Sequence, residues 1–126
     1  MSWKLVVDIK VTNLERAKLF YETVLGFPVK QHEPKEGWCA LIVGNAQIHL
    51  YEQGGASDNV EFAVENIEVE TKRLKEKGVA FCSGMDKPQA QSFVNGGITI
   101  FPWGKSAFFK DTEGNILALI QDNPPA

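Results

Sequence analysis

The sequence predicts an α+β fold built from two tandem modules, each with the element order β-α-β-β-β. Three observations support this. The pattern Val11-Thr12-Asn13-Leu14-Glu15 returns as Val64-Glu65-Asn66-Ile67-Glu68, with its asparagines 53 residues apart (66 − 13). Each copy follows a run of alternating apolar residues, and each opens a helical stretch that ends at a glycine. We therefore expect one domain over residues 1–126, with module one at about 1–54 and module two at about 55–126.

The first module begins with a strand and a helix. Residues 3–11 carry apolar side chains at every odd position, and this period of two is typical of a strand with one face toward a core. Asn13 is a good N-cap, because its side-chain oxygen accepts from an unpaired N–H of the first helical turn. Leu14, Ala17 and Tyr21 follow at helical spacing. Gly26 stands where a glycine with positive φ ends a helix.

Three strands complete the first module around a polar turn at residues 33–37. They are expected over Val29–Gln31, Trp38–Val43 and Ala46–Glu52. In the last of these, Ile48 and Leu50 share one face, while Gln47, His49 and Tyr51 share the other.

The second module repeats this plan. Val60, Phe62 and Val64 are expected to face its core, and a helix runs from the Asn66 cap to Gly78. Its remaining strands are expected over Ala80–Ser83, Ile98–Phe101, Ser106–Lys110 and Ile116–Gln121. The segment Ser83–Gly97 is polar and rich in glycine, and we expect an irregular loop over a site.

Composition narrows the class of function. The net charge of −3 gives no electrostatic reason to expect nucleic acid or an anionic membrane as a partner. No stretch is apolar enough to span a bilayer and no signal-peptide core opens the chain, so we expect a cytoplasmic protein. Cys39 and Cys82 are far apart in apolar sequence and are expected to be reduced and buried. Nucleotide-binding and common hydrolase motifs are absent.

The chain resembles the glyoxalase / bleomycin-resistance / ring-cleaving dioxygenase superfamily, also called vicinal oxygen chelate proteins. The resemblance rests on Val11–Ala17 with Phe20-Tyr21 and Leu25-Gly26-Phe27, on Val60–Asn66, and on Phe109–Asn115. The last segment matches the family's aspartate-x-acid-glycine-asparagine turn before the final strand. The resemblance implies two βαβββ modules that form a curled mixed sheet around a cavity, often completed by a homodimer.

The resemblance also implies where metal-dependent members hold their ion. Counted from the shared motifs, the standard ligand positions fall on Val6, His49, Asn59 and Ala118. Val6 and Ala118 cannot coordinate and Asn59 is a poor ligand, whereas catalytic metal sites usually need about three protein ligands. The resemblance therefore predicts no standard metal site and no cofactor.

A relocated site is the alternative. Asp8 and Glu61 stand two residues beyond Val6 and Asn59, so they are expected on the same face. With His49 they would form a histidine and two carboxylates, a set that holds iron or zinc. The same three residues are candidates for metal-free acid/base catalysis. His49 as a structural histidine, or as a hydrogen-bond donor to a ligand, also stays open.

The sequence favours a metal-free protein that binds a small organic molecule in the cleft between its modules, as in bleomycin-resistance sequestration. The alternative is a glyoxalase-like lyase or isomerase, or a dioxygenase. Trp103 is the preferred aromatic contact, while Trp38 and Phe108 fit a core equally well. The expected ligand-binding residues are Asp8, His49, Tyr51, Asn59, Glu61 and Trp103. Acidic residues (Asp8, Glu61, Glu65) favour a cationic ligand, although Lys10 partly offsets them. Expected partners are this ligand and a second copy of the chain.

Overall fold

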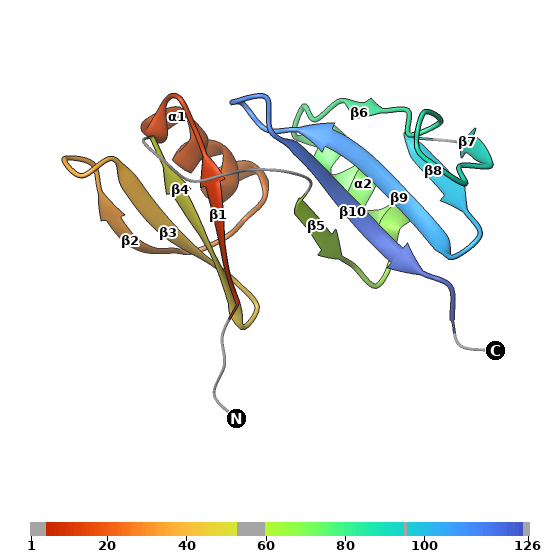
Figure 1. Cartoon of the computed structure of the whole chain (residues 1–126), viewed down its shortest axis with the longest axis horizontal. Helices are drawn as coiled ribbons and strands as arrows, with labels where there is room; N and C mark the ends of the chain where they lie inside the picture. Colours follow the sequence, from red (N-terminus) through yellow and green to blue (C-terminus); the bar gives the residue numbers. More distant parts are fainter. Residues whose placement is uncertain (1–4, 53–59, 95, 125–126) are drawn as a thin grey trace. The chain divides into compact units, whose positions relative to one another are not determined.

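The structure, a computed structural model, describes residues 5–52, 60–94 and 96–124, and it confirms an α+β fold of two tandem modules (Figure 1). The chain divides into two compact units. The first comprises Met1–Asp58 and Asp111–Asn115, and the second comprises Asn59–Lys110 and Ile116–Ala126. Each unit has its own open mixed sheet.

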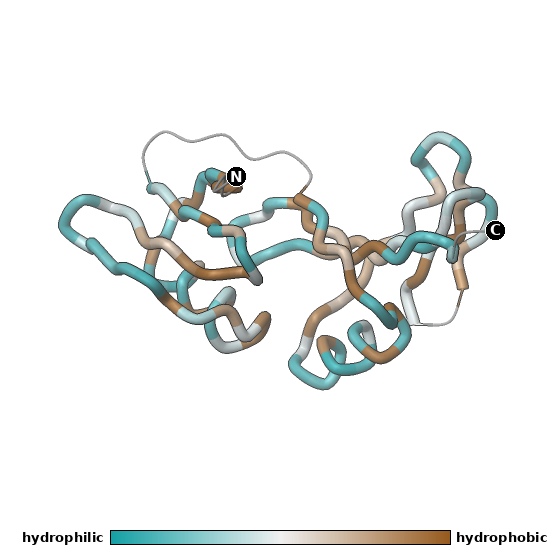
Figure 2. The backbone as a smooth tube through the Cα atoms, turned by 90° about the horizontal axis from the view of Figure 1, so that it is seen from below, coloured by the Kyte–Doolittle hydropathy of each residue, from teal (hydrophilic) through white to brown (hydrophobic). Residues whose placement is uncertain are grey.

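The first sheet has four strands in the order β1-β4-β3-β2 (Figure 1). These are β1 (Val6–Lys10), β2 (Val29–Glu33), β3 (Trp38–Val43) and β4 (Ala46–Tyr51). Strand β1 pairs in parallel with β4, and the other neighbours are antiparallel. The β2–β3 turn is hydrophilic, as its sequence predicts (Figure 2).

One helical segment packs on this sheet. It consists of α1 (Leu14–Leu19), which continues into a π-helical turn, η1 (Phe20–Val24). The Asn13 side chain accepts from the Arg16 N–H at 3.0 Å, which confirms the predicted N-cap. Gly26 has a φ of 83° and confirms the predicted end. The π turn, in which the Leu25 N–H bonds to the Phe20 carbonyl, was not expected because apolar spacing does not distinguish it from an α-helix.

The first core lies between this helical segment and the sheet. Its buried apolar residues are Ile9, Val11, Leu14, Ala17, Tyr21, Leu25, Cys39, Leu41, Ile48 and Leu50. The predicted inward positions Leu14, Ala17 and Tyr21 of the helix and Ile48 and Leu50 of β4 are therefore confirmed. In the first run Ile9 and Val11 are buried as predicted, but Leu5 is 66% exposed because it precedes the first residue of β1, and its expected place in the core was wrong. Alternate residues of β1, β3 and β4 point to the opposite face, where the candidate site lies.

The turn at residues 111–115 belongs to the first unit and is held to its helical segment by two carboxylates. Asp111 is buried and accepts from the Tyr21 hydroxyl at 2.9 Å. Glu113 accepts from the backbone N–H groups of Thr12 and Asn13, at 3.0 and 2.8 Å, and from the Arg16 Nε at 2.8 Å. This family-like turn therefore closes the N-terminal end of α1.

The second sheet has six strands. The order is β5-β10-β9-β8-β7, and β6 also pairs with β9. These are β5 (Val60–Ala63), β6 (Phe81–Cys82), β7 (Ser92–Val94), β8 (Ile98–Phe101), β9 (Gly104–Lys110) and β10 (Ile116–Asp122). Helix α2 (Ile67–Glu76) covers one face of this sheet, behind β9 and β10 in Figure 1.

The second core, like the first, lies between a capped helix and one face of the sheet. Asn66 caps α2 by accepting from the Val69 N–H at 3.1 Å, and Gly78 follows the helix with a φ of 91°. The buried apolar residues under α2 include Ile67, Leu74, Ala107, Phe109, Leu117 and Leu119. No helix in the described ranges is long and apolar enough to cross a membrane.

Two sequence expectations in this unit were wrong. The segment Ser83–Gly97 is not irregular throughout, because Ser92–Val94 pairs with β8 as strand β7 and closes through glycines with positive φ. Cys82 is exposed rather than buried, because β6 pairs with β9 over only two residues and places that thiol on the uncovered face. Cys39 is buried, as expected.

Candidate functional site

The candidate site lies on the face of the first sheet opposite α1, which we call the open face. Strand pairing sets its members, because paired residues in neighbouring strands point to the same side. Val6, Asp8 and Lys10 of β1 pair with Gln47, His49 and Tyr51 of β4, which in turn pair with Ile42, Ala40 and Trp38 of β3. The open face thus brings polar and aromatic side chains together.

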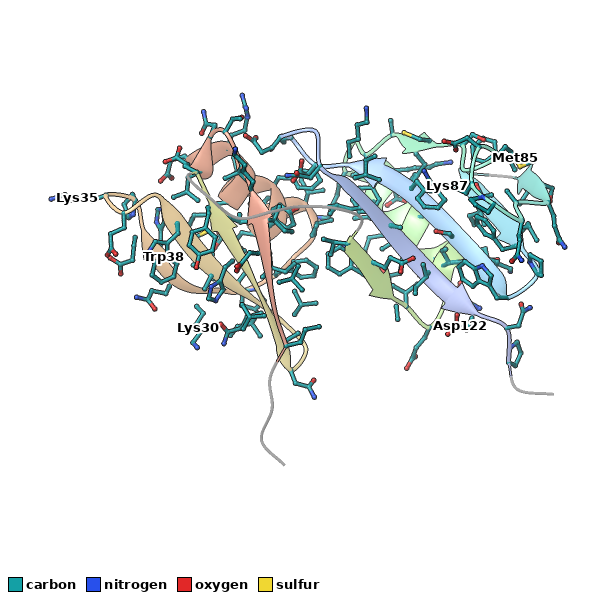
Figure 3. The ribbon with its side chains drawn as sticks, in the orientation of Figure 1. Lys30, Lys35, Trp38, Met85, Lys87 and Asp122 are labelled. Atoms are coloured by element: carbon teal, nitrogen blue, oxygen red, sulfur yellow. The ribbon has the colours of Figure 1, made fainter. Side chains whose placement is uncertain are left out.

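Three aromatic rings form a cluster on the open face. The Trp38 ring is stacked with the His49 ring at 5.8 Å between centroids and with the Tyr51 ring at 6.3 Å. The His49 and Tyr51 rings lie 6.0 Å apart in a tilted arrangement. All three residues are half-buried. Trp38 extends from the first residue of β3 (Figure 3), so the rings keep accessible surface outside the core.

Both ring nitrogens of His49 contact neighbours on its own strand. Nε2 lies 3.1 Å from the Gln47 Oε1 atom, and Nδ1 lies 3.3 Å from the Tyr51 hydroxyl. An amide oxygen only accepts, so Nε2 donates to Gln47, while the Tyr51 hydroxyl can donate to Nδ1 or accept from it. The orientation of the ring is therefore set by packing against Trp38 and by two hydrogen bonds.

Charged groups flank the aromatic cluster. Asp8 pairs with His49 across β1 and β4, and Glu33 pairs with Trp38 across β2 and β3. Lys10 pairs with Tyr51 and supplies a positive charge on the same face. Glu33 accepts from the Gln31 amide at 3.2 Å, so its carboxylate is held beside the Trp38 position. The three charged groups Asp8, Glu33 and Lys10 together carry one net negative charge.

The structure brings three of the predicted site residues together. Asp8, His49 and Tyr51 share the open face. Glu61 and Trp103 belong to the second unit, where Glu61 is exposed on β5 and Trp103 is 39% exposed and stacks on Phe101 at 5.1 Å. Asn59 lies outside the described residues. A joint site of Asp8, His49 and Glu61 therefore stays a prediction.

The sequence left Trp38 open between core and site, and Glu33 was not named as a site residue. The alternation of β3 assigns Trp38 to a face but does not say which face the helix covers. The signal was available in the hairpin: pairing β3 with β4 around residues 44 and 45 places Trp38 opposite Tyr51. The same reasoning along β2 places Glu33 beside it.

The residues at the family's metal-ligand positions do not fit an ion. Val6 and Ala118 end in hydrocarbon, and the Ala118 methyl is buried in the second unit. His49 has the right chemistry, but Gln47 and Tyr51 occupy both of its nitrogens. Within each unit, the described residues contain no group of three histidine, cysteine, aspartate or glutamate side chains placed to hold a metal.

Comparisons with known proteins agree with this fold. Residues 5–119 match the family model described as Glyoxalase/Bleomycin resistance protein/Dioxygenase superfamily. No curated protein matches the chain.

Solved structures share the fold at low identity. TnmS3, an antibiotic binding protein from Streptomyces sp. CB03234, is 23% identical, with 98% of each chain covered and a TM-score of 0.74. A lactoylglutathione lyase from Agrobacterium tumefaciens is 14% identical, covering 96% of this chain and 94% of its own, with a TM-score of 0.73. The integron cassette protein HFX_CASS4, from the mobile metagenome of a Halifax Harbour sewage outfall, is 26% identical, covering 96% and 99%, with a TM-score of 0.73. The family model covers most of the sequence, so this chain belongs to the glyoxalase/bleomycin resistance protein/dioxygenase superfamily.

Proposed function

We propose that this protein binds a small organic molecule on the open face of its first sheet and sequesters it unchanged. The observation that carries the proposal is the stacked cluster of Trp38, His49 and Tyr51, which is half-buried on the face that α1 does not cover. Aromatic rings held rigidly with accessible surface are suited to stacking a planar ligand. The similarity in fold to an antibiotic binding protein is consistent with this class of function.

The charges around the cluster favour a cationic ligand. Asp8 and Glu33 stand on opposite sides of the aromatic rings, and Lys10 offsets one of them. A ligand cation above an aromatic face gains from the ring quadrupole as well as from a nearby carboxylate. A planar aromatic cation, or a basic antibiotic of the bleomycin type, satisfies both requirements.

Binding without a metal is part of this proposal. Two of the four family ligand positions are hydrocarbon, and the histidine at a third is engaged by its own strand neighbours. We therefore expect the affinity for the ligand to be the same before and after treatment with EDTA, measured by calorimetry. An affinity that falls with EDTA and returns with a stoichiometric divalent ion would contradict this part of the proposal.

Acid/base catalysis by His49 is the enzymatic alternative. Its support is the pairing of Asp8 with His49 across the two strands. Against it, Gln47 and Tyr51 already contact both ring nitrogens, so the imidazole must first give up one of these hydrogen bonds to take a proton from a substrate. Mass spectrometry of bound ligand after long incubation separates the two. Sequestration predicts that the ligand is recovered unchanged.

The test of the open face is a calorimetric titration with proflavine and with bleomycin at fixed salt. Trp38→Ala and Asp8→Asn are each expected to weaken binding by about tenfold, because stacking and a carboxylate contact contribute about 1–2 kcal/mol each. Trp103→Ala is the matched variant, because it removes an exposed indole from the second unit. Binding that is lost only with Trp103→Ala would overturn the proposal.

Assembly into a homodimer remains an expectation drawn from the family resemblance. Light scattering on a gel-filtration peak tests it directly. A dimer gives twice the chain mass of 14.0 kDa at micromolar concentration, whereas a monomer gives 14.0 kDa and contradicts the expectation.

A further inference from the structure

A pocket of about 240 Å³ lies in the second unit, on the sheet face opposite α2. Its walls come from the end of β9, the start of β10, the end of β6 and the loop that follows β6. Cys82 pairs with Phe108, and Ile116 pairs with Lys110, so these four side chains share that face. The loop adds Asp86 and Lys87, of which Lys87 is labelled in Figure 3. None of these residues belongs to the open face of the first unit.

Backbone contacts hold the loop wall in place. The Gly84 N–H donates to the Thr99 hydroxyl at 2.9 Å in buried surroundings. A Cβ atom at Gly84 would overlap the Phe108 ring, so only glycine lets the backbone pack this closely. The loop is thus pinned both by a buried hydrogen bond and by an aromatic ring.

The pocket has a positive charge in a chain whose net charge is negative. Lys87 and Lys110 line it together with a single carboxylate, Asp86. The Lys87 ammonium lies 3.7 Å from that carboxylate and 5.4 Å from the centroid of the Phe108 ring. No ion pair to Lys110 occurs among the described residues. One ammonium charge is therefore left for an anionic ligand group.

Apart from Ser83, the rest of the lining is largely apolar. Phe108 supplies an aromatic floor, and Ile116 is 40% exposed beside it. The volume is somewhat below that of a typical drug-sized site. A free phosphate would contact the lysines but would leave the apolar walls without an apolar partner. A ligand with an apolar ring and one carboxylate matches both the apolar walls and the two lysine ammonium groups.

We infer that this pocket binds a small aromatic carboxylate, with the ring on Phe108 and the carboxylate between Lys87 and Lys110. Its lining residues and its charge preference differ from those of the open face of the first unit.

Cys82 gives a built-in reporter for this pocket. Its thiol is exposed and lines the pocket, whereas Cys39 is buried. Burial raises the pKa of the Cys39 thiol to about 11, so it is almost entirely protonated and unreactive at pH 7.5. N-ethylmaleimide, an uncharged reagent, should therefore label Cys82 selectively, and mass spectrometry gives the rate.

The experiment measures this labelling rate with benzoate, benzylamine or inorganic phosphate at constant ionic strength. Benzoate is expected to slow labelling saturably, and the other two are expected to have no effect. A Lys87→Met, Lys110→Met double variant should need at least about tenfold more benzoate, because two charge-assisted contacts are lost. Lys72→Met, which removes an exposed lysine from α2, serves as the matched control and should behave as wild type.

The outcomes separate the alternatives. Equal protection by benzylamine or phosphate would overturn the assigned ligand class. A labelling rate that is unchanged at 10 mM benzoate, a concentration on the order of the Kd of a weak metabolite site, would show that benzoate does not bind in this pocket and would overturn the proposal. Circular dichroism confirms that each variant is folded, and benzoate-dependent changes in amide NMR signals of β9 give a second readout that does not need the thiol.

Discussion

Glu113 holds the first unit together at the N-terminal end of α1, and its removal should be costly. Its side chain is only 1% exposed and accepts from the backbone N–H groups of Thr12 and Asn13 and from the Arg16 guanidinium. Hydrogen bonds to a charged group contribute about 1.5–3 kcal/mol each when buried. Thr12 and Asn13 are exposed, so water replaces part of each bond. We expect Glu113→Ala to lower the free energy of unfolding by about 2–4 kcal/mol.

Urea unfolding followed by circular dichroism at pH 7 measures this cost. Glu113→Gln keeps one acceptor oxygen and should lower the free energy of unfolding by about half as much as Glu113→Ala. Glu36→Ala removes an exposed glutamate from the β2–β3 turn and should change stability by no more than about 0.5 kcal/mol. A Glu113→Ala effect as small as that of Glu36→Ala would refute the reasoning, since it would mean that water satisfies the helix end equally well.

The pH dependence gives a second test of the same carboxylate. The hydrogen bond from the Arg16 side chain, with further bonds from Thr12, Thr112 and the Asn13 backbone, lowers the pKa of Glu113 far below its ordinary value of about 4.3. A lowered folded-state pKa stabilises the fold above the unfolded pKa, and this contribution is lost as pH falls toward the folded value. The difference in free energy of unfolding between wild type and Glu113→Gln should therefore be constant from pH 7 to about 5 and become smaller below about pH 4. A difference that widens in acid would contradict this.

Four further substitutions test the fold. Tyr21→Phe removes the hydroxyl that donates to Asp111 at 2.9 Å. It should lower the free energy of unfolding by about 1–2 kcal/mol in urea, and not more, because Asp111 keeps three other donors. An unchanged free energy of unfolding would mean that this buried hydrogen bond contributes nothing. Asn13→Ala and Asn66→Ala should each cost about 1 kcal/mol, and clearly unequal costs would contradict the equivalence of the two caps. Gly97→Ala should lower the melting temperature by several degrees, because the φ of Gly97 is +95° and the new Cβ would overlap the Phe81 side chain of β6. A melting temperature equal to that of wild type would contradict this strain.

Much of the fold was predictable because its signals are local. The two asparagine caps and the glycines after each helix satisfy requirements of a few neighbouring residues, and the structure places them as the repeat predicts. Strand alternation likewise gave the buried faces. The π turn at η1 and the exposure of Cys82 depend on packing and pairing with distant segments, so local patterns could not reveal them.

The candidate site was predictable only in part. Asp8 and His49 were expected on one face from their strand periods, and the structure pairs them directly. Trp38 was ambiguous between core and site, because a large aromatic residue fits either face of a strand until the helix position is known. The absence of metal-ligand chemistry at Val6 and Ala118 followed from residue identity alone, which is why it could be recognised without a structure.

The most direct test of the proposed function is an NMR titration of ¹⁵N-labelled protein with proflavine. Binding on the open face predicts saturable shifts of the Trp38 indole N–H signal and of the backbone amides around His49 and Tyr51, with a much weaker response in Trp38→Ala. Shifts confined to the second unit, or no shift at millimolar proflavine, on the order of the weakest specific binding, would contradict the account.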